Sequence, residues 1–260
     1  MDITAFSDLP HWLATGVMGS ARITPAFFLL PFFTSGILSA TIRMPVIMLI
    51  GASLWPYPIN ALPLDDINGY LLILFQEVFI GLILGILFAM PFWIMHGIGS
   101  FIDNQRGATI SSTLDPMSGV DTSELANLFN LFAGALFLLG GGLTLLLETF
   151  RTSYQLCEPL STCSPALVPT FGLITQLMSK VIILASPVLA ALLLSEILLG
   201  LLSRFAPQMN AFSISLTVKS LVAFFIIILY FSPILPEAFR SLWLNQNQLG
   251  TWLTIVTENH

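Results

Sequence analysis

Charged residues are scarce in this chain of 260 residues, and their scarcity excludes most soluble folds. Only 8% of the residues are Asp, Glu, Lys or Arg, whereas a soluble domain carries about a quarter. A chain this poor in charge cannot cover a water-facing surface with polar groups. Because 56% of its residues are hydrophobic, the composition predicts an all-α integral membrane protein.

Basic residues are the rarer charges, which excludes nucleic acid as a partner. The chain has 8 Lys and Arg against 14 Asp and Glu, a formal net charge of -6. Nucleic-acid binding needs a basic surface that displaces counterions from phosphates. The first ten residues contain Asp2 and Asp8 but no basic residue, unlike the basic start of a cleavable signal peptide. We therefore expect the first apolar segment to remain in the mature protein, surrounded by membrane lipids.

Residues that bind metals or perform bond chemistry are also few. The two cysteines, Cys157 and Cys163, lie in one short polar stretch with no His nearby, so a metal site is not expected there. They either form a disulfide or stay unpaired, and the sequence leaves both open. The chain has no Walker loop and no His-Glu-x-x-His motif, and His96 stands alone in its apolar segment. We expect no enzyme activity, no cofactor and no metal.

Long apolar runs supply the helices that the composition predicts. A helix needs about 20 apolar residues to cross a bilayer. Prolines inside or beside several runs predict kinks, and residues 71–99 form either one long bent helix or a helical hairpin. The predicted fold is thus a polytopic set of kinked hydrophobic helices and hairpins. The expected helical segments are residues 12–34, 44–62, 71–99, 125–150, 171–203 and 214–236.

Arginines in the predicted connections indicate a topology, because short cytoplasmic loops are enriched in basic residues. Arg43, Arg106 and Arg204 lie in alternate connections, which places both termini outside a six-span protein. We expect one helical domain at residues 1–238. The tail at residues 239–260 is expected to form an interfacial helix or a docking segment.

Charged residues inside apolar segments are the most informative positions, since each costs a few kcal/mol in a bilayer. Such residues pair across helices, line a cavity or face a partner. They are Arg22, Glu77, Lys180, Glu196 and Lys219. On two predicted helices a glycine lies four residues after a charged residue. The two residues therefore lie on the same face of the helix, and a glycine on that face favours close packing. These sets are Glu77, Gly81 and Gly85, and Glu196, Gly200 and Arg204.

The most polar stretch lies between the third and fourth apolar segments. It begins with Asp103-Asn104-Gln105-Arg106-Gly107 and continues through small hydroxyl residues to Asp115-Pro116. Glycine, hydroxyl residues and an Asp-Pro turn predict a loop. A plain solvated connection is usually shorter, and polar loops that enter protein-lined cavities form gates in membrane proteins.

Motifs spread along most of the chain together resemble one known family. They are Asp103-Asn104-Gln105-Arg106-Gly107-Ala108, Asp115-Pro116, Pro187, Glu196-x-x-x-Gly200-x-x-x-Arg204-Phe205-Ala206-Pro207-Gln208-Met209-Asn210-x-Phe212 and Lys219. These motifs resemble the SctT/FliR family of export-apparatus proteins, from type III secretion systems and the bacterial flagellum. The resemblance runs from about Arg22 to about Lys219 and is closer to the injectisome branch.

The resemblance implies an assembly. One copy of the chain would coil with several SctR/FliP-type and SctS/FliQ-type subunits into a helical hetero-oligomeric cone in the bacterial inner membrane. In such assemblies the cone is raised toward the periplasm, so the six-span arrangement would describe only the unassembled chain. The SctU/FlhB-type switch protein is a further implied partner, and unfolded effector polypeptides are the implied cargo.

The resemblance also implies roles for particular residues. The loop after the polar motif would protrude into the lumen and help to plug the closed channel, while charged residues would pair with neighbouring subunits. The expected plug residues are Ser111, Ser112, Thr113, Leu114, Asp115, Pro116 and Met117. The expected subunit-packing charges are Arg22, Glu77, Asp103, Arg106, Glu196, Arg204 and Lys219.

Together these features predict a structural and gating subunit of a protein-export channel. The alternative from another class is a proton-coupled small-molecule transporter, in which Glu77 and Glu196 titrate beside proline-broken helices. A transporter works as a monomer or a homodimer, whereas a gate subunit depends on different partner chains.

Overall fold

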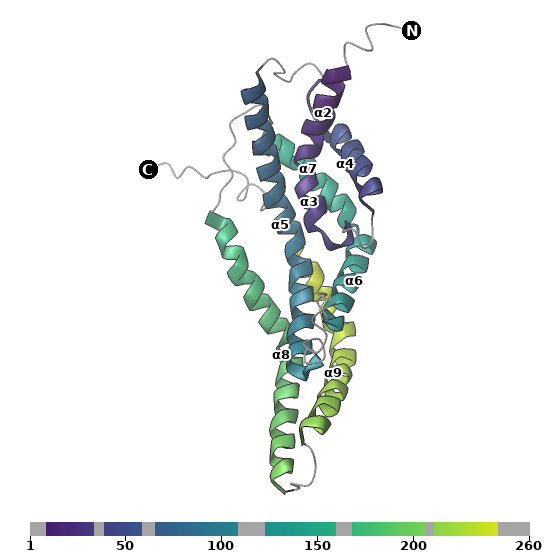
Figure 1. Cartoon of the computed structure of the whole chain (residues 1–260), viewed down its shortest axis with the longest axis vertical. Helices are drawn as coiled ribbons and strands as arrows, with labels where there is room; N and C mark the ends of the chain where they lie inside the picture. Colours follow the sequence, from purple (N-terminus) through teal and green to yellow (C-terminus); the bar gives the residue numbers. More distant parts are fainter. Residues whose placement is uncertain are drawn as a thin grey trace. The chain divides into compact units, whose positions relative to one another are not determined.

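The computed structural model describes residues 9–33, 39–58, 66–108, 123–159, 168–205 and 211–243. All regular structure in these ranges is helical, which confirms the predicted all-α fold (Figure 1). The elements are α2 (Leu9–Ala21), α3 (Thr24–Leu29), the short 3-10 helix η1 (Pro31–Phe33), α4 (Ala40–Leu54), α5 (Ile67–Arg106), α6 (Glu124–Leu139), α7 (Gly142–Leu156), α8 (Val168–Phe205) and α9 (Ala211–Ser241).

The chain divides into two compact units, and each is described by itself. Unit 1 comprises Met1–Met90, Phe137–Leu173 and Leu244–His260, and unit 2 comprises Pro91–Leu136 and Ile174–Trp243. Helix α5 contributes its first part to unit 1 and the part from Pro91 onward to unit 2. A single domain at residues 1–238 with a separate tail stays a prediction, since residues 244–260 lie outside the described residues.

In unit 1, α2 and α4 lie side by side, and their backbones touch (Figure 1). A Cβ on Gly19 would lie 2.6 Å from the carbonyl oxygen of Gly51. Only glycine leaves room for this approach, which is the small-residue packing found between membrane helices. Met18, Trp55 and Tyr154 form a buried cluster in the same unit.

The first part of α5 packs against the turn after α2 and against α3 through two glycines. A Cβ on Gly85 would lie 2.8 Å from the Cα of Ala26, and one on Gly81 would overlap the carbonyl oxygen of Arg22. This glycine face therefore packs within the chain. On α8, by contrast, no atom of the described residues outside the helix's own backbone lies within 4 Å of a Cβ added at Gly200.

In unit 2, aromatic side chains hold α9 against α5 and α6. The ring centroid of Phe231 lies 5.3 Å from that of Phe129 and 4.3 Å from that of Phe132. Phe92 of α5 and Phe239 of α9 meet edge to face at 5.5 Å. Aromatic pairs contribute about 0.5–1.5 kcal/mol each beyond the area they bury, so these contacts position the polar ends of the same helices.

Among the residues that the structure describes, three helices are long and apolar enough to cross a membrane, and one bent pair is a fourth candidate. The three are Ile67–Arg106, Ile174–Phe205 and Ile214–Phe231. The pair is α6 with α7, which are bent by 72°. Gly141 lies at the bend with a φ of 82°, a left-handed conformation that glycine adopts without strain. The protein is therefore a polytopic membrane protein.

The structure corrects the prediction of six spans. Residues 12–34 are not one span, because a turn at Arg22 and Ile23 separates α2 from the six-residue α3. Helix α4 has 15 residues, fewer than the roughly 20 that a bilayer needs. Arg43 lies inside α4 rather than in a connection, which weakens the predicted topology. The run at residues 71–99 belongs to one continuous helix of 40 residues, not to a hairpin.

Candidate functional site

The polar motif at residues 103–106 forms the last turn of α5 in unit 2, and its side chains reach three other helices. Gly107 follows the helix with a φ of 83°, a common helix ending. Asp103 reaches the start of α6, Gln105 reaches α8 and Arg106 reaches α9. The motif therefore ties α5 to α6, α8 and α9 within unit 2.

Asp103 caps the start of α6. Its side chain is fully buried, and one carboxylate oxygen lies 2.7 Å from Nε of Arg106. The other oxygen accepts hydrogen bonds from the Ser123 hydroxyl at 2.8 Å and from the backbone N–H of Leu125 at 2.9 Å. The Ser123 hydroxyl oxygen in turn accepts from the N–H of Ala126 at 3.3 Å. Two of the N–H groups that a helix start leaves unpaired are thus satisfied. We call Asp103, Arg106, Ser123 and the N–H of Leu125 the Asp103 cluster.

Two further contacts hold the Asp103 cluster in place. The guanidinium of Arg106 lies over the ring of Phe224 in α9, 5.2 Å from its centroid. Gly99, one helical turn before Asp103, lets the α5 backbone touch that of Ala126 in α6. The end of α5 and the start of α6 are therefore held side by side.

Glu196 joins α5, α8 and α9 beside the same turn. One of its carboxylate oxygens lies 3.0 Å from Nζ of Lys219, and Gln105 donates to that oxygen at the longer distance of 3.4 Å. The Lys219 side chain is 11% exposed, whereas that of Glu196 is 52% exposed. Glu196 and Lys219 thus pair within the chain, although the resemblance implies pairing with other subunits.

Arg204 and Gly200 are exposed on the same face of α8 as Glu196. Arg204 forms no hydrogen bond or ion pair with the side chains that the structure describes, and space beside Gly200 is open. A role for Arg204 in subunit packing stays a prediction.

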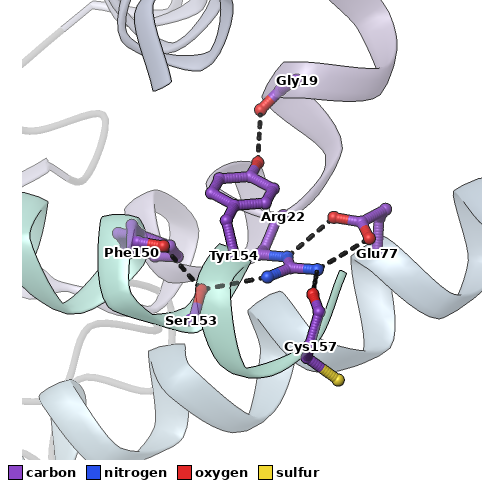
Figure 2. Close-up of polar contacts among 7 residues, drawn as sticks. All are labelled: Gly19, Arg22, Glu77, Phe150, Ser153, Tyr154 and Cys157. Carbon is purple, nitrogen blue, oxygen red and sulfur yellow. Dashed lines mark hydrogen bonds and ion pairs between the residues drawn. The ribbon is translucent and has the colours of Figure 1, made fainter. Parts of the chain in front are cut away.

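In unit 1, Arg22 and Glu77 form a buried ion pair (Figure 2). Arg22 donates to both carboxylate oxygens, from Nε at 2.7 Å and from Nη2 at 2.8 Å. It also donates to the Ser153 hydroxyl at 3.1 Å and to the Cys157 carbonyl at 2.9 Å. The guanidinium lies over the ring of Tyr154, 4.1 Å from its centroid. We call Arg22, Glu77, Ser153, Tyr154 and Cys157 the Arg22 cluster.

The Arg22 cluster connects three parts of unit 1. Arg22 sits in the turn after α2, Glu77 lies on α5, and the remaining residues belong to α7 or follow it. The Tyr154 hydroxyl donates to the Gly19 carbonyl at 3.2 Å, which adds α2 itself. A buried charge pair is tolerated only when its geometry is good and its remaining polar atoms are bonded. Arg22 and Glu77 meet that condition inside the chain, so they need no partner subunit, in contrast to the expectation from the resemblance.

Sequence reasoning identified the charges of both clusters but missed their hydroxyl partners. Ser153 and Tyr154 lie in a half-polar helix, and no pattern marks them as partners of Arg22. Ser123 had a signal, since a serine directly before a helix that opens with Glu124 is a common N-cap arrangement.

Other predicted residues have different outcomes. Cys157 is disulfide-bonded, whereas Cys163 lies outside the described residues, so their pairing stays a prediction. The plug residues 111–117 also lie outside the described residues. Within the described ranges, no three His, Cys, Asp or Glu residues gather closely enough to hold a metal ion.

Comparison with known proteins gives one consistent result. The model of the family "Bacterial export proteins, family 1" matches residues 13–245. The chain belongs to this family of bacterial export proteins. It is 47% identical over 247 residues to "Surface presentation of antigens protein SpaR" of Salmonella typhimurium, covering 95% of this chain and 94% of the relative.

More distant relatives place this export protein within its family. "Yop proteins translocation protein T" of Yersinia pestis is 26% identical over 90% of the chain and 92% of its own length. "Flagellar biosynthetic protein FliR" of Pectobacterium carotovorum is 28% identical over 79% of each chain. The export protein is thus a member of the injectisome branch of the SctT/FliR family. It is a multi-pass membrane subunit of a type III secretion export apparatus.

Proposed function

We propose that this export protein is a structural and gating subunit of the type III secretion export gate. One copy assembles with SctR-type and SctS-type subunits in the bacterial inner membrane and forms the channel that unfolded effector polypeptides cross. The observation that carries the proposal is the Asp103 cluster, which joins both ends of the most polar segment of an otherwise apolar chain.

The wider arrangement of the gate belongs to the same proposal. The assembled subunits form a helical cone within the base of the secretion system, raised toward the periplasm. The SctU/FlhB-type switch protein is a further partner. Two compact units joined by the continuous helix α5 suit a chain that supplies two packing elements to such a cone.

The segment that follows residue 108 is the proposed plug. With its ends held together, the 14 residues at 109–122 reach at most about 24 Å from their base. Small hydroxyl residues and the Asp115-Pro116 pair suit a segment that meets water or polypeptide, because lipid cannot satisfy their polar groups. Residues 111–117 are therefore proposed to narrow the lumen when the gate is idle.

The exposed face of α8 supports assembly with other subunits. In the most apolar 18-residue stretch of Ile174–Phe205, only 28% is buried within the chain. Lipid tails offer no partner to Arg204 or to the exposed side of Glu196. A polar group of another subunit can form the hydrogen bond or ion pair that lipid cannot offer to these side chains. Gly200 leaves room for a closely packed helix.

The geometry does not favour the proton-coupled transporter. Glu77, one of the two carboxylates that this alternative needs, is fully buried and bonded to Arg22 through both oxygens. A carboxylate that carries protons or substrate must be reached by water. Glu77 is instead a structural partner of Arg22.

Deletion of residues 111–117 tests the plug. The altered chain is co-expressed with its partner subunits, and the intact complex is reconstituted into liposomes for ion-flux measurement. We expect normal assembly and a faster ion leak, because the lumen loses its seal. Deletion of residues 2–8, which has the same length and removes no residue with an assigned role, is the control and should leave the leak unchanged. An unchanged leak in a correctly assembled 111–117 deletion contradicts the plug.

A further inference from the structure

A cavity lies in unit 1 where α4 and α7 end. Its volume is about 590 Å³, within the range of about 300–1,000 Å³ that small-molecule sites occupy. Trp55 and Tyr57 line it from the chain that follows α4, and Arg151, Gln155 and Glu158 line it from the last turns of α7 and the residue positions just after them. None of these five residues belongs to the Arg22 cluster or to the Asp103 cluster, so the cavity is a separate site.

The polar side chains of the cavity carry both signs of charge. Arg151 and Gln155 are exposed one turn apart on α7, and neither side chain forms a hydrogen bond or ion pair with the residues that the structure describes. Glu158 is also exposed and accepts a hydrogen bond from the Tyr57 hydroxyl at 3.4 Å. Arg151 offers N–H donors to an anion, and Glu158 offers oxygen acceptors to a cation. A ligand with an anionic group beside a cationic one therefore matches the cavity.

Aromatic side chains form the buried wall of the cavity. The ring of Trp55 meets that of Tyr57 edge to face at 5.8 Å and that of Tyr154 at 6.1 Å. Trp55 is 8% exposed, and its indole N–H is buried without a hydrogen-bond partner among the described residues. A buried donor of this kind is normally bonded to a ligand or to ordered water. Tryptophan and tyrosine at helix ends are also typical of the membrane–water interface, where lipid head groups lie.

Exposed apolar side chains precede the cavity on both helices. On α7, Leu143 and Leu147 are exposed, and their spacing of four places them on the same helix face as Arg151. On α4, Met48 and Leu49 are exposed on the turns before the cavity. An acyl chain covers such side chains, whereas a soluble ligand leaves them bare. The cavity and the helix faces that lead to it thus fit a molecule with a charged head and an apolar tail.

We propose that this cavity binds the head group of a zwitterionic phospholipid, a phosphate ester joined to a primary ammonium as in phosphatidylethanolamine. Arg151 and Gln155 donate to the phosphate oxygens, and Glu158 accepts from the ammonium. The ends of α4 and α7 add to the attraction for the ammonium, because the C-terminus of a helix carries a partial negative charge. The inference goes beyond the proposed export function and does not depend on it, since it gives the chain a specific ligand in the surrounding membrane.

The test measures lipid binding to the full chain by native mass spectrometry, in the assembly in which the chain is recovered from mild detergent. Delipidated protein is titrated with phosphatidylethanolamine or with phosphatidylglycerol, which has the phosphate but no ammonium. Arg151→Gln should weaken binding of both lipids about fivefold, the size of a partly exposed ion pair, and Glu158→Gln should weaken only phosphatidylethanolamine by a similar factor. Arg240→Gln and Glu237→Gln make the same charge changes at exposed positions of α9, outside the cavity, and should leave both affinities unchanged.

Further comparisons separate a lipid from other occupants of the cavity. Glycerophosphoethanolamine, the head group without acyl chains, should bind about a hundredfold more weakly than the lipid, because acyl chains add apolar burial; equal binding overturns the lipid as the source of the head group. The native protein should bind phosphatidylethanolamine about fivefold more tightly than phosphatidylglycerol. Equal affinities for the two lipids overturn the proposal. An Arg151→Gln protein that binds lipid like the Arg240→Gln control also overturns it, as expected if a neighbouring subunit covers the cavity.

Discussion

Loss of Glu77 should be one of the most damaging single substitutions in unit 1. Arg22 is fully buried and forms four hydrogen bonds, two of them to Glu77. After Glu77→Leu, the guanidinium keeps two of these hydrogen bonds, to the Ser153 hydroxyl and to the Cys157 carbonyl. Removing one partner of a buried pair costs about 3–5 kcal/mol, whereas losing one hydrogen bond to a charged group costs about 1.5–3 kcal/mol. We therefore expect Glu77→Leu to destabilise the protein more than Ser153→Ala does.

The free energy of unfolding is measured in mild detergent by titration with a denaturing detergent, followed by tryptophan fluorescence. Thr152→Val is the matched control, because Thr152 lies beside Ser153 but donates only to the Glu148 carbonyl of its own helix. Its effect should stay within about 0.5 kcal/mol. Replacing both charges, with Arg22→Met and Glu77→Leu together, should recover part of the loss. A Glu77→Leu protein as stable as the Thr152→Val control would show that buried Arg22 does not depend on Glu77.

Three further substitutions test other parts of unit 1. Gly81→Ala should lower thermal stability in detergent far more than Gly200→Ala, because only the first Cβ meets another backbone; equal effects would contradict this packing. Cys157→Ser should lower the free energy of unfolding by about 2 kcal/mol, because the unfolded chain loses the constraint of a short disulfide-closed loop. The same unfolding titration measures this change. Thiol labelling of the wild-type chain, denatured without a reductant, should find no free cysteine. Burial, and then the nearby Glu158 carboxylate, raise the pKa of Tyr57 above its ordinary value of 10.0. Glu158→Gln should therefore lower that pKa, which ultraviolet titration of tyrosinate detects; an unchanged pKa would remove Glu158 as a cause.

The long helices were predictable from sequence, and the breaks were less so. Apolar runs place α5, α8 and α9 because their length exceeds what a bilayer needs. The break after α2 has a signal in Pro25, since proline favours the first turn of a new helix. The bend between α6 and α7 has a signal in three consecutive glycines, Gly140, Gly141 and Gly142. Both signals are local and stand inside otherwise continuous apolar runs, where they are easily read as kinks.

The charged members of the site were predictable because charge is costly in an apolar segment. Their partners were not, because the contacts join residues far apart in the sequence. Arg22 meets Glu77 across 55 residues and Ser153 across 131. Such pairings follow from how the helices pack, which periodicity alone does not specify. The family resemblance led to a different expectation, that these charges pair between subunits.

We propose that this export protein works as one copy within a hetero-oligomeric export gate. The most direct test is the intact mass of the complex purified in mild detergent after expression with and without SctR-type and SctS-type subunits. We expect one copy of this chain in a larger hetero-oligomer and poor recovery when it is expressed alone. A stable monomer or homodimer that forms regardless of those subunits would contradict it.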